Sequence, residues 1–222
     1  MNLFFGRFSG IYYNQPMELL IHGVFDATTL KTLQSLNVPR IAFDLRGKSL
    51  NLIPFHVLKS LIPFFKGHIN YLTFENDKSE TVVSFLSLLG DEQHKFQLEF
   101  RDTQHVSFYA SIRHPFSWFF NPEGDWENIL TLPHLKSLVL PVKFQDIYQN
   151  LPKLWHMIQA RNLEVILHVE SFVDLELYVQ EKNLAVSVDL GKEMEICFRQ
   201  VDQFRLINLS IWRNTYEIAS GQ

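Results

Sequence analysis

Residues 17 to 51 read MELLIHGVFDATTLKTLQSLNVPRIAFDLRGKSLN, and this stretch decides the expected fold. An apolar run from 18 to 24 leads into an amphipathic segment from 28 to 36, and a second apolar run follows from 40 to 45. Asp26 stands just before the amphipathic segment, where it suits the N-cap of a helix. The order strand, helix, strand with short turns is the unit that joins parallel strands.

The same alternation continues along the chain. Eight strands are expected, near 18–24, 40–45, 70–74, 96–100, 137–142, 165–169, 185–190 and 205–211. Most of these segments are continuous apolar runs, as expected for parallel strands covered on both faces. Eight strand–helix units predict an α/β fold, a single (β/α)8 TIM barrel, with a doubly wound open sheet as the alternative.

One domain is expected over all 222 residues. Residues 1–16 are aromatic and rich in turn residues, and we interpret them as an N-terminal extension. Residues 103–135 are longer than one helix needs and carry Pro115, Pro122 and Gly124 among many aromatic residues. We therefore predict an irregular aromatic-rich insertion between strands four and five. It should lack one long helix and pack its Phe and Trp side chains against the barrel or a second subunit.

Composition excludes several classes of function. The formal net charge is −4 and no basic block stands out, so no nucleic-acid partner is expected. No apolar run is long enough for a membrane span, and the N-terminus is not a convincing signal peptide. The single cysteine, Cys197, excludes an intrachain disulfide, fits a reducing compartment and is expected to be buried within a helix. We expect a cytoplasmic protein without a cofactor, either a monomer or a homodimer, with a small-molecule ligand.

Candidate functional residues follow from the barrel itself, because functional side chains lie at the C-terminal ends of the strands. The predicted strand ends offer His22, Asp44, Glu75, Glu99, Arg101, His168, Glu170, Asp189, Asn208 and Ser210. Most of these are explained by a polar rim that faces water. His22 and His168 stand out, because both follow apolar runs and two imidazoles can exchange protons near neutral pH. The competing interpretation is a hydrogen-bonded histidine pair without turnover.

The remaining candidates are ligand contacts. We predict contributions to substrate binding from Asp44, Lys48, Glu99, Asp189, Asn208 and Ser210. The Lys48–Ser49 pair suits an anion, although such a pair more often forms a simple turn. A metal site is an alternative, because His22, His168, Glu99 and Asp189 offer nitrogen and oxygen ligands. No HxH or HExxH spacing supports it, and no metal site is predicted.

The first hundred residues resemble phosphoribosylanthranilate isomerase, a (β/α)8 enzyme of the tryptophan pathway. That family opens with a strand reading K-I-C-G, matched here by LIHG at 20–23. Its second strand ends in G-F-x-F-x-x-K-S-x-R, matched by AFDLRGKSLN at 42–51, and its fourth strand reads V-Q-L-H-G, matched by FQLEF at 96–100. Element spacing matches over 17–102 and, more weakly, over 163–213.

The resemblance implies roles for substituted positions. The family's general base, a cysteine on strand one, is replaced by His22, and its general acid, an aspartate ending strand six, is replaced by His168. The arginine that serves the substrate carboxylate is Asn51. The glycines that let backbone N–H groups approach a phosphate are missing, and Asp189 stands where it would repel one. The D-x-S pattern of the family's eighth strand becomes Asn208-Leu209-Ser210.

Two functions are therefore expected as alternatives. The first is a divergent isomerase of the aldose–ketose type, with a small polar substrate at the barrel mouth and with His22 and His168 as acid and base. The second is a non-catalytic, degenerate barrel that binds a ligand or a protein partner. An anion bound at the ends of strands seven and eight would favour the enzyme, whereas a mouth closed by side chains would favour the binding module.

Overall fold

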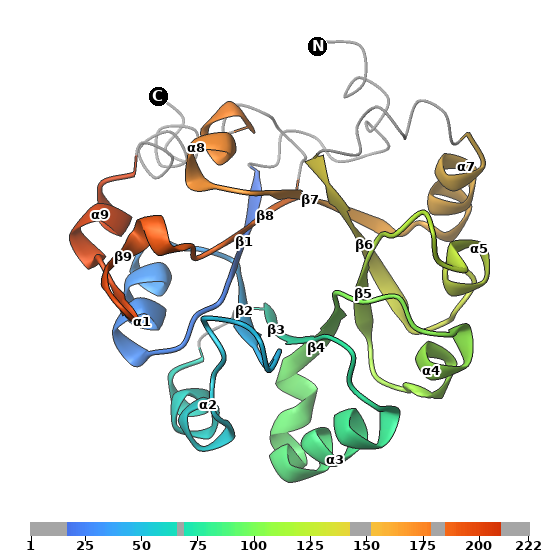
Figure 1. Ribbon diagram of the computed structural model, residues 1–222, viewed down its shortest axis with the longest axis horizontal. Coiled ribbons are helices and arrows are strands. Elements are labelled where there is room, and N and C mark those ends of the chain that lie inside the picture. The colour runs from blue at the N-terminus through green and yellow to red at the C-terminus, as the bar shows by residue number, and fades with distance from the viewer. Residues whose placement is uncertain (1–16, 66–68, 143–151, 179–184, 210–222) are drawn as a thin grey trace.

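The computed structural model describes residues 17–65, 69–142, 152–178 and 185–209. Eight parallel strands close into a barrel in the order of the sequence, and the first strand pairs with both the second and the last (Figure 1). The strands are β1 (Glu18–His22), β2 (Arg40–Asp44), β3 (Ile69–Phe74), β4 (Phe96–Phe100), β5 (Phe116–Phe119), β6 (Leu135–Pro141), β7 (Glu164–Val169) and β8 (Ala185–Asp189). The predicted (β/α)8 barrel is confirmed, and the open sheet is excluded.

Short helices surround the barrel (Figure 1). They are α1 (Ala27–Ser35), α2 (Phe55–Leu61), α3 (Ser79–Leu89), α4 (Val106–Ser111), α5 (Trp126–Ile129), α7 (Pro152–Arg161), α8 (Phe172–Leu175) and α9 (Gln203–Ile207). Short 3-10 helices lie at η2 (Ile62–Phe64), η3 (Gly90–Lys95), η5 (Glu176–Tyr178) and η6 (Lys192–Met194). The predicted cap of α1 is confirmed, because the Asp26 side chain accepts a hydrogen bond from the Thr29 backbone at 2.8 Å. Within the described residues, no helix is long and apolar enough to cross a membrane.

The strands alternate between two environments. One set of side chains packs outward against the helices and forms the main hydrophobic core. The other set points into the barrel, where a small cluster of Leu20, Ala42, Tyr71, Val139 and Ile166 fills the lumen. Several further inward positions are buried but polar, namely His22, Asp44, Thr73, Glu99, Ser117, Ser137 and Ser187. The barrel interior is therefore polar toward its C-terminal end, and it lies inside an apolar outer layer.

The prediction of an irregular insertion at 103–135 is wrong. This stretch contains regular elements of the barrel, namely α4, β5 and α5. Strand β5 has only four residues and its inward Ser117 interrupts the apolar run, so its sequence resembles a loop. The expectation of no long helix is confirmed. So is the packing of the aromatic side chains against the barrel, since Tyr109, Phe116 and Trp118 are fully buried.

The predicted strand at 205–211 is also wrong. Residues 203–207 form α9, whose first turn is capped by the Asp202 side chain, which accepts from the Arg205 backbone at 2.9 Å. The eighth strand of the barrel is instead β8, which corresponds to the predicted strand at 185–190. The short apolar run there has no length or periodicity that separates strand from helix, and the missed β5 left the predicted count one strand short.

Two smaller expectations concern residues near the end and the start of the chain. Cys197 is exposed, and it ends β9 (Glu195–Cys197), which pairs antiparallel with β10 (Gln200–Val201), where a helix was expected. The proposed extension at 1–16 lies outside the described residues.

The N-terminal end of the barrel is held by a buried cation. Arg40 begins β2 and pairs with Glu18 and, at 2.5 Å, with Glu164, which begin β1 and β7. Its guanidinium also lies 3.4 Å from the Tyr71 hydroxyl in the lumen. Burial raises the pKa of Tyr71 to about 12, although the positive charge of Arg40 acts in the opposite direction.

Trp118→Ala should lower the free energy of unfolding by about 3–5 kcal/mol, because it removes a fully buried side chain of β5 and the hydrogen bond from its indole to the Asp102 carbonyl. Phe204→Ala on α9, where the side chain is 81% exposed, is the matched control and should change stability by less than about 0.5 kcal/mol. Urea unfolding monitored by circular dichroism measures both. Equal effects of the two truncations would contradict the assignment of β5 to the core.

Tyr71→Phe should remove part of the alkaline instability. The folded pKa of Tyr71 lies above that of the unfolded chain, near 10, so its contribution to stability is intact below pH 10 and is lost as the pH rises toward 12. Stability of the wild-type protein should fall faster than that of the variant between these pH values, by about 1.4 kcal/mol per pH unit. Parallel unfolding curves from pH 9 to 12 would show that this hydroxyl ionises as readily in the folded protein.

Candidate functional site

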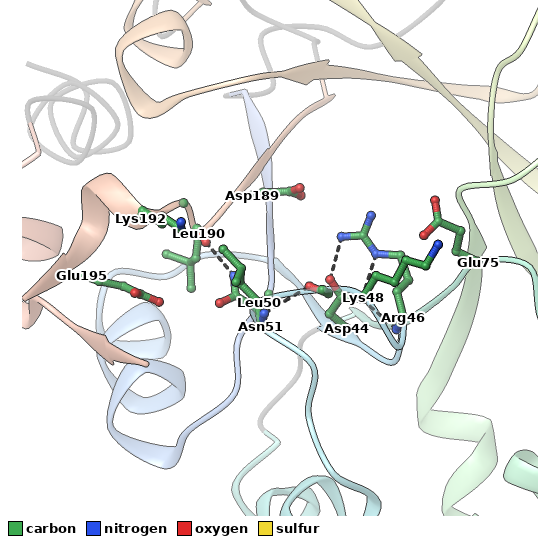
Figure 2. Close-up of a pocket in the computed structure, with 13 residues that line it drawn as sticks. Asp44, Arg46, Lys48, Leu50, Asn51, Glu75, Asp189, Leu190, Lys192 and Glu195 are labelled. Atoms are coloured by element: carbon green, nitrogen blue, oxygen red, sulfur yellow. Dashed lines mark hydrogen bonds and ion pairs between the residues drawn. The ribbon is translucent and has the colours of Figure 1, made fainter. Parts of the chain in front are cut away.

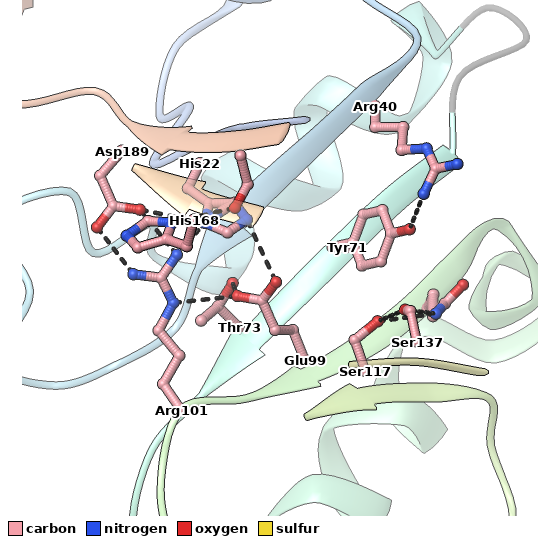
Figure 3. A network of polar contacts seen from close by, with 12 residues as sticks. His22, Arg40, Tyr71, Thr73, Glu99, Arg101, Ser117, Ser137, His168 and Asp189 are labelled. Atoms are coloured by element: carbon pink, nitrogen blue, oxygen red, sulfur yellow. Dashed lines mark hydrogen bonds and ion pairs between the residues drawn. The ribbon is translucent and has the colours of Figure 1, made fainter. Parts of the chain in front are cut away.

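Four strands bring their ionisable residues together at the C-terminal mouth of the barrel. His22 ends β1 and stands opposite Asp189, the last residue of β8. Glu99 and His168 are the penultimate residues of β4 and β7. The imidazoles of His22 and His168 are stacked with centroids 5.8 Å apart (Figure 3). The prediction that both histidines point into the mouth, near enough for one small ligand, agrees with this arrangement.

His22 lies between two carboxylates. Its Nε2 is 3.2 Å from Glu99 Oε2, and its Nδ1 is 3.1 Å from Asp189 Oδ1. The His22 side chain is 3% exposed and the Glu99 side chain is fully buried. His22 Nε2 and Glu99 Oε2 are close enough for an ion pair, but they are not aligned for a hydrogen bond, and neither atom has another hydrogen-bond partner in the described residues. A buried carboxylate oxygen without a donor is costly, so this pair needs an explanation.

Arg101 occupies the centre of the mouth (Figure 3). Its guanidinium donates to both oxygens of Asp189 at 2.7 and 2.8 Å, and its Nε donates to Glu99 Oε1 at 3.1 Å. It also contacts His22 Nδ1 and lies 4.3 Å above the centroid of the Phe119 ring. From sequence, Arg101 was one of ten rim residues. Its bridging role depends on β4 and β8 facing each other across the barrel.

Burial sets the charge states of the cluster. It raises the pKa of Glu99 well above its usual value, and the negative charge of Asp189 adds to the effect. Burial would also raise the pKa of Asp189, but Arg101 outweighs it and holds this carboxyl below its ordinary range. Burial lowers the pKa of His168 to about 4, and the positive charge of Arg101 acts in the same direction. Burial among these groups thus favours the neutral form of the His168 imidazole.

His168 is held in place by its neighbours on both sides. Its Nδ1 lies 3.0 Å from the buried hydroxyl of Ser187 on β8. The Phe119 ring packs against it in an edge-on arrangement, with centroids 5.1 Å apart. These contacts fix the orientation of the imidazole ring.

An open cleft of about 320 Å³ lies beside this cluster (Figure 2). It is lined by residues from the loops that follow β1, β2, β3 and β8, and these are Gly23, Asp44, Arg46, Lys48, Ser49, Leu50, Asn51, Glu75, Asp189, Leu190, Gly191, Lys192 and Glu195. Asp189 belongs to both the cleft and the histidine cluster. The cleft and the histidine cluster therefore adjoin each other at Asp189.

Two contacts shape this cleft. The Asn51 side-chain amide donates to the Leu190 carbonyl at 2.6 Å and ties the loop after β2 to the loop after β8. Gly23 has φ +79°, and a Cβ there would lie 2.5 Å from the Asn51 amide nitrogen, so only glycine fits beside this bridge. Asp44 is bound by Arg46 at 2.6 and 2.9 Å.

The structure places the predicted site residues in two groups. His22, Asp44, Lys48, Glu99, His168 and Asp189 lie at the mouth or in the cleft. Asn208 does not, because its segment is helical and its side chain donates to the Phe204 carbonyl at 2.7 Å on α9. Ser210 lies outside the described residues. Arg46 and Lys192, which line the cleft from the loop after β2 and from the start of η6, were not singled out from the sequence.

The carry-over of the family's general acid to His168 is wrong in position. That acid ends strand six, whereas His168 lies on β7, and β6 ends in Leu140-Pro141. The error follows from β5, whose omission shifted every later strand by one. The same shift makes Asp189 the last residue of strand eight, whereas the predicted strand at 185–190 was the seventh.

No family model matches this sequence, and the search of curated proteins found no match. Solved structures do match. Phosphoribosylanthranilate isomerase from Thermus thermophilus has a TM-score of 0.63 and 17% identity, and the one from Thermotoga maritima has a TM-score of 0.62 and 15% identity. Each alignment covers 93% of this chain and 100% of the other. An aldolase/citrate lyase family protein from Burkholderia cenocepacia follows, with a TM-score of 0.54 and 9% identity over 79% of this chain and 88% of the other.

At these identities the likeness establishes the fold. The resemblance first seen in the motifs of strands one, two and four therefore extends to the whole architecture, and the chain has the (β/α)8 barrel fold of the solved phosphoribosylanthranilate isomerases.

Proposed function

We propose that this phosphoribosylanthranilate isomerase-like barrel binds a compact polar molecule in the cleft after β1, β2 and β8, and that its reaction differs from the tryptophan-pathway isomerisation. The observation that carries the proposal is the position of Asp189, which lines the cleft and also contacts His22. A ligand in the cleft would thus present one end to the histidine cluster. This is the place where barrels of this fold hold their substrates.

The charges in the cleft indicate the kind of ligand. Lys192 and Glu195 lie on one side, and Lys48 and Glu75 lie on the other, with Asn51 and Asp189 between them (Figure 2). Within the part of the chain that the structure describes, no ion pair forms on either lysine, whereas Arg46 is neutralised by Asp44. Unpaired charges of both signs favour a polar ligand that carries at least one anionic group.

The residues at the ends of β7 and β8 favour a reaction different from that of the family. Phosphate sites of such barrels are commonly built by the loops after strands seven and eight. Here Glu170 follows β7 directly and Asp189 ends β8, so two carboxylates stand near that position. Asn51, in place of the family's arginine, is uncharged and is committed to the Leu190 carbonyl. The two anionic groups of the family's substrate thus lose their partners.

A second function, a binding module without turnover, is favoured by the closed mouth. Arg101 fills the space between Asp189 and Glu99, and its side chain is 7% exposed. His22 and Glu99 lie beneath it, both buried. In this function the cleft holds its ligand, and the cluster below contributes stability and orientation.

The chain should fail to restore growth of a tryptophan auxotroph that lacks phosphoribosylanthranilate isomerase. The physical reason is the pair of carboxylates after β7 and β8, together with the uncharged Asn51. Growth without tryptophan is the measurement, an authentic isomerase in the same vector is the positive control, and soluble expression is verified by immunoblot. Growth supported by this chain would contradict the proposed change of reaction.

Lys48→Ala and Lys192→Ala should each weaken ligand binding about 10-fold or more, since each removes a charged donor from the cleft. The probes are a panel of sugar phosphates, hydroxy acids and amino acids, screened by ligand-observed NMR and measured by calorimetry. Lys136→Ala is the matched control, because this lysine is exposed at the N-terminal end of β6.

Panel members that bind wild type and all three variants equally would contradict the cleft as the binding site. Turnover of a bound panel member that falls about 100-fold in His22→Ala would decide for the enzyme over the binding module.

A further inference from the structure

We propose that His22, His168 and Asp189 form a binding site for one divalent transition-metal ion, with zinc the best fit, at the C-terminal mouth of the barrel. One ligand atom from each of these residues lies within 4.8 Å of the other two. Two imidazole nitrogens and one carboxylate oxygen form a donor set that zinc accepts. This set has no recognisable spacing in the sequence, because its members lie on β1, β7 and β8 and come together only when the barrel closes.

The surroundings of His168 suit a metal ligand. Its Nδ1 faces the Ser187 hydroxyl at 3.0 Å, which can accept the ring N–H and leave Nε2 with its lone pair. Metal-bound histidines commonly donate their second ring N–H to such a neighbour, which fixes the tautomer and the ring orientation. The edge-on Phe119 ring holds the imidazole from another side.

His22 also has a neighbour at each ring nitrogen. A bound metal ion would explain why His22 Nε2 and Glu99 Oε2 face each other without other partners among the described residues. Its Nδ1 lies 3.1 Å from Asp189 Oδ1, so one ion can take both atoms as ligands. The ring proton is then placed on Nε2, 3.2 Å from Glu99 Oε2. Both of these buried atoms lack a hydrogen bond in the described structure. A metal on Nδ1 would thus keep the ring proton on the nitrogen that faces Glu99, as in the carboxylate–histidine–metal arrangement.

Arg101 is the competitor for this site. Its guanidinium donates to both Asp189 oxygens and contacts His22 Nδ1, so it uses the lone pairs that an ion would need. Metal binding therefore requires the Arg101 side chain to turn out of the mouth. Loss of this cation should strengthen metal binding, an outcome that a merely structural histidine–carboxylate network does not predict.

This inference deepens the proposed function, since Asp189 places the ion at the wall of the cleft. Three protein ligands leave a coordination position for water or for a ligand, as in catalytic zinc sites. When bound there, the ion would supply Lewis acidity toward an oxygen of the ligand. The metal site is formed by protein side chains alone, however, and its test uses no cleft ligand. Failure of the panel binding experiment and failure of metal binding are therefore separate results.

The test is titration of the purified full-length chain, after treatment with a chelator, with Co²⁺ by visible absorption and with Zn²⁺ by calorimetry. We expect one ion per chain and the visible bands of a nitrogen- and oxygen-ligated Co²⁺. His168→Ala and Asp189→Asn should each weaken affinity at least 10-fold, and Ser187→Ala should weaken it about 10-fold. Arg101→Met should tighten it, and His156→Ala on the exposed face of α7 should leave it unchanged.

Circular dichroism and thermal melting verify that each variant is folded. His168→Gln replaces His168→Ala where the latter fails to fold. Wild-type and Arg101→Met proteins that both fail to bind Co²⁺ and Zn²⁺ would overturn the proposal. Undiminished binding by folded His168 and Asp189 variants would overturn it equally, because the ion would then be held by other histidines on the surface.

Discussion

Closure of the barrel by the pairing of β1 with β8 is the constraint on which the rest of this structure depends. Five residue pairs, from Glu18 opposite Ala185 to His22 opposite Asp189, join the first strand to the last. Closure satisfies the backbone of both strands and removes the edges that an open sheet would expose. It also makes every strand end at one mouth. Residues far apart in the sequence, such as His22 and Asp189 at a separation of 167 positions, thereby come into contact.

The mouth concentrates charge where water is scarce. Glu99 is fully buried, and the Thr73 hydroxyl at 3.2 Å and Arg101 at 3.1 Å both engage the same oxygen. Burial of an ion pair seldom stabilises a fold more than apolar packing would, and groups with strongly perturbed pKa values gather at functional sites. The dry layer between barrel and helices already provides the core, so the polar lumen is a specialised feature of this chain.

The chain shares the fold of the solved isomerases but few of their residues. The fold is retained over 93% of the chain at 10–17% identity, as expected when the outer core requires only apolar residues of suitable volume. At the strand ends and in the loops that follow them, this chain builds a polar network of its own. Asn51 illustrates this, because it joins two loops through the Leu190 carbonyl and makes Gly23 the only residue that fits beside it. One fold can host many reactions through such changes.

The sequence by itself determined the barrel, seven of its strands and the positions of both histidines at strand ends, because continuous apolar runs and short turns are local signals. It did not reveal β5, whose four residues alternate around Ser117, and it made a strand of the helix at 203–207. Only the tertiary structure decided that His168 belongs to the seventh strand and that Arg101 bridges Glu99 to Asp189. Likewise, only closure decided which nitrogens and oxygens face one another, because side-chain partners across a barrel are set by strand count and register, which no short stretch of sequence encodes.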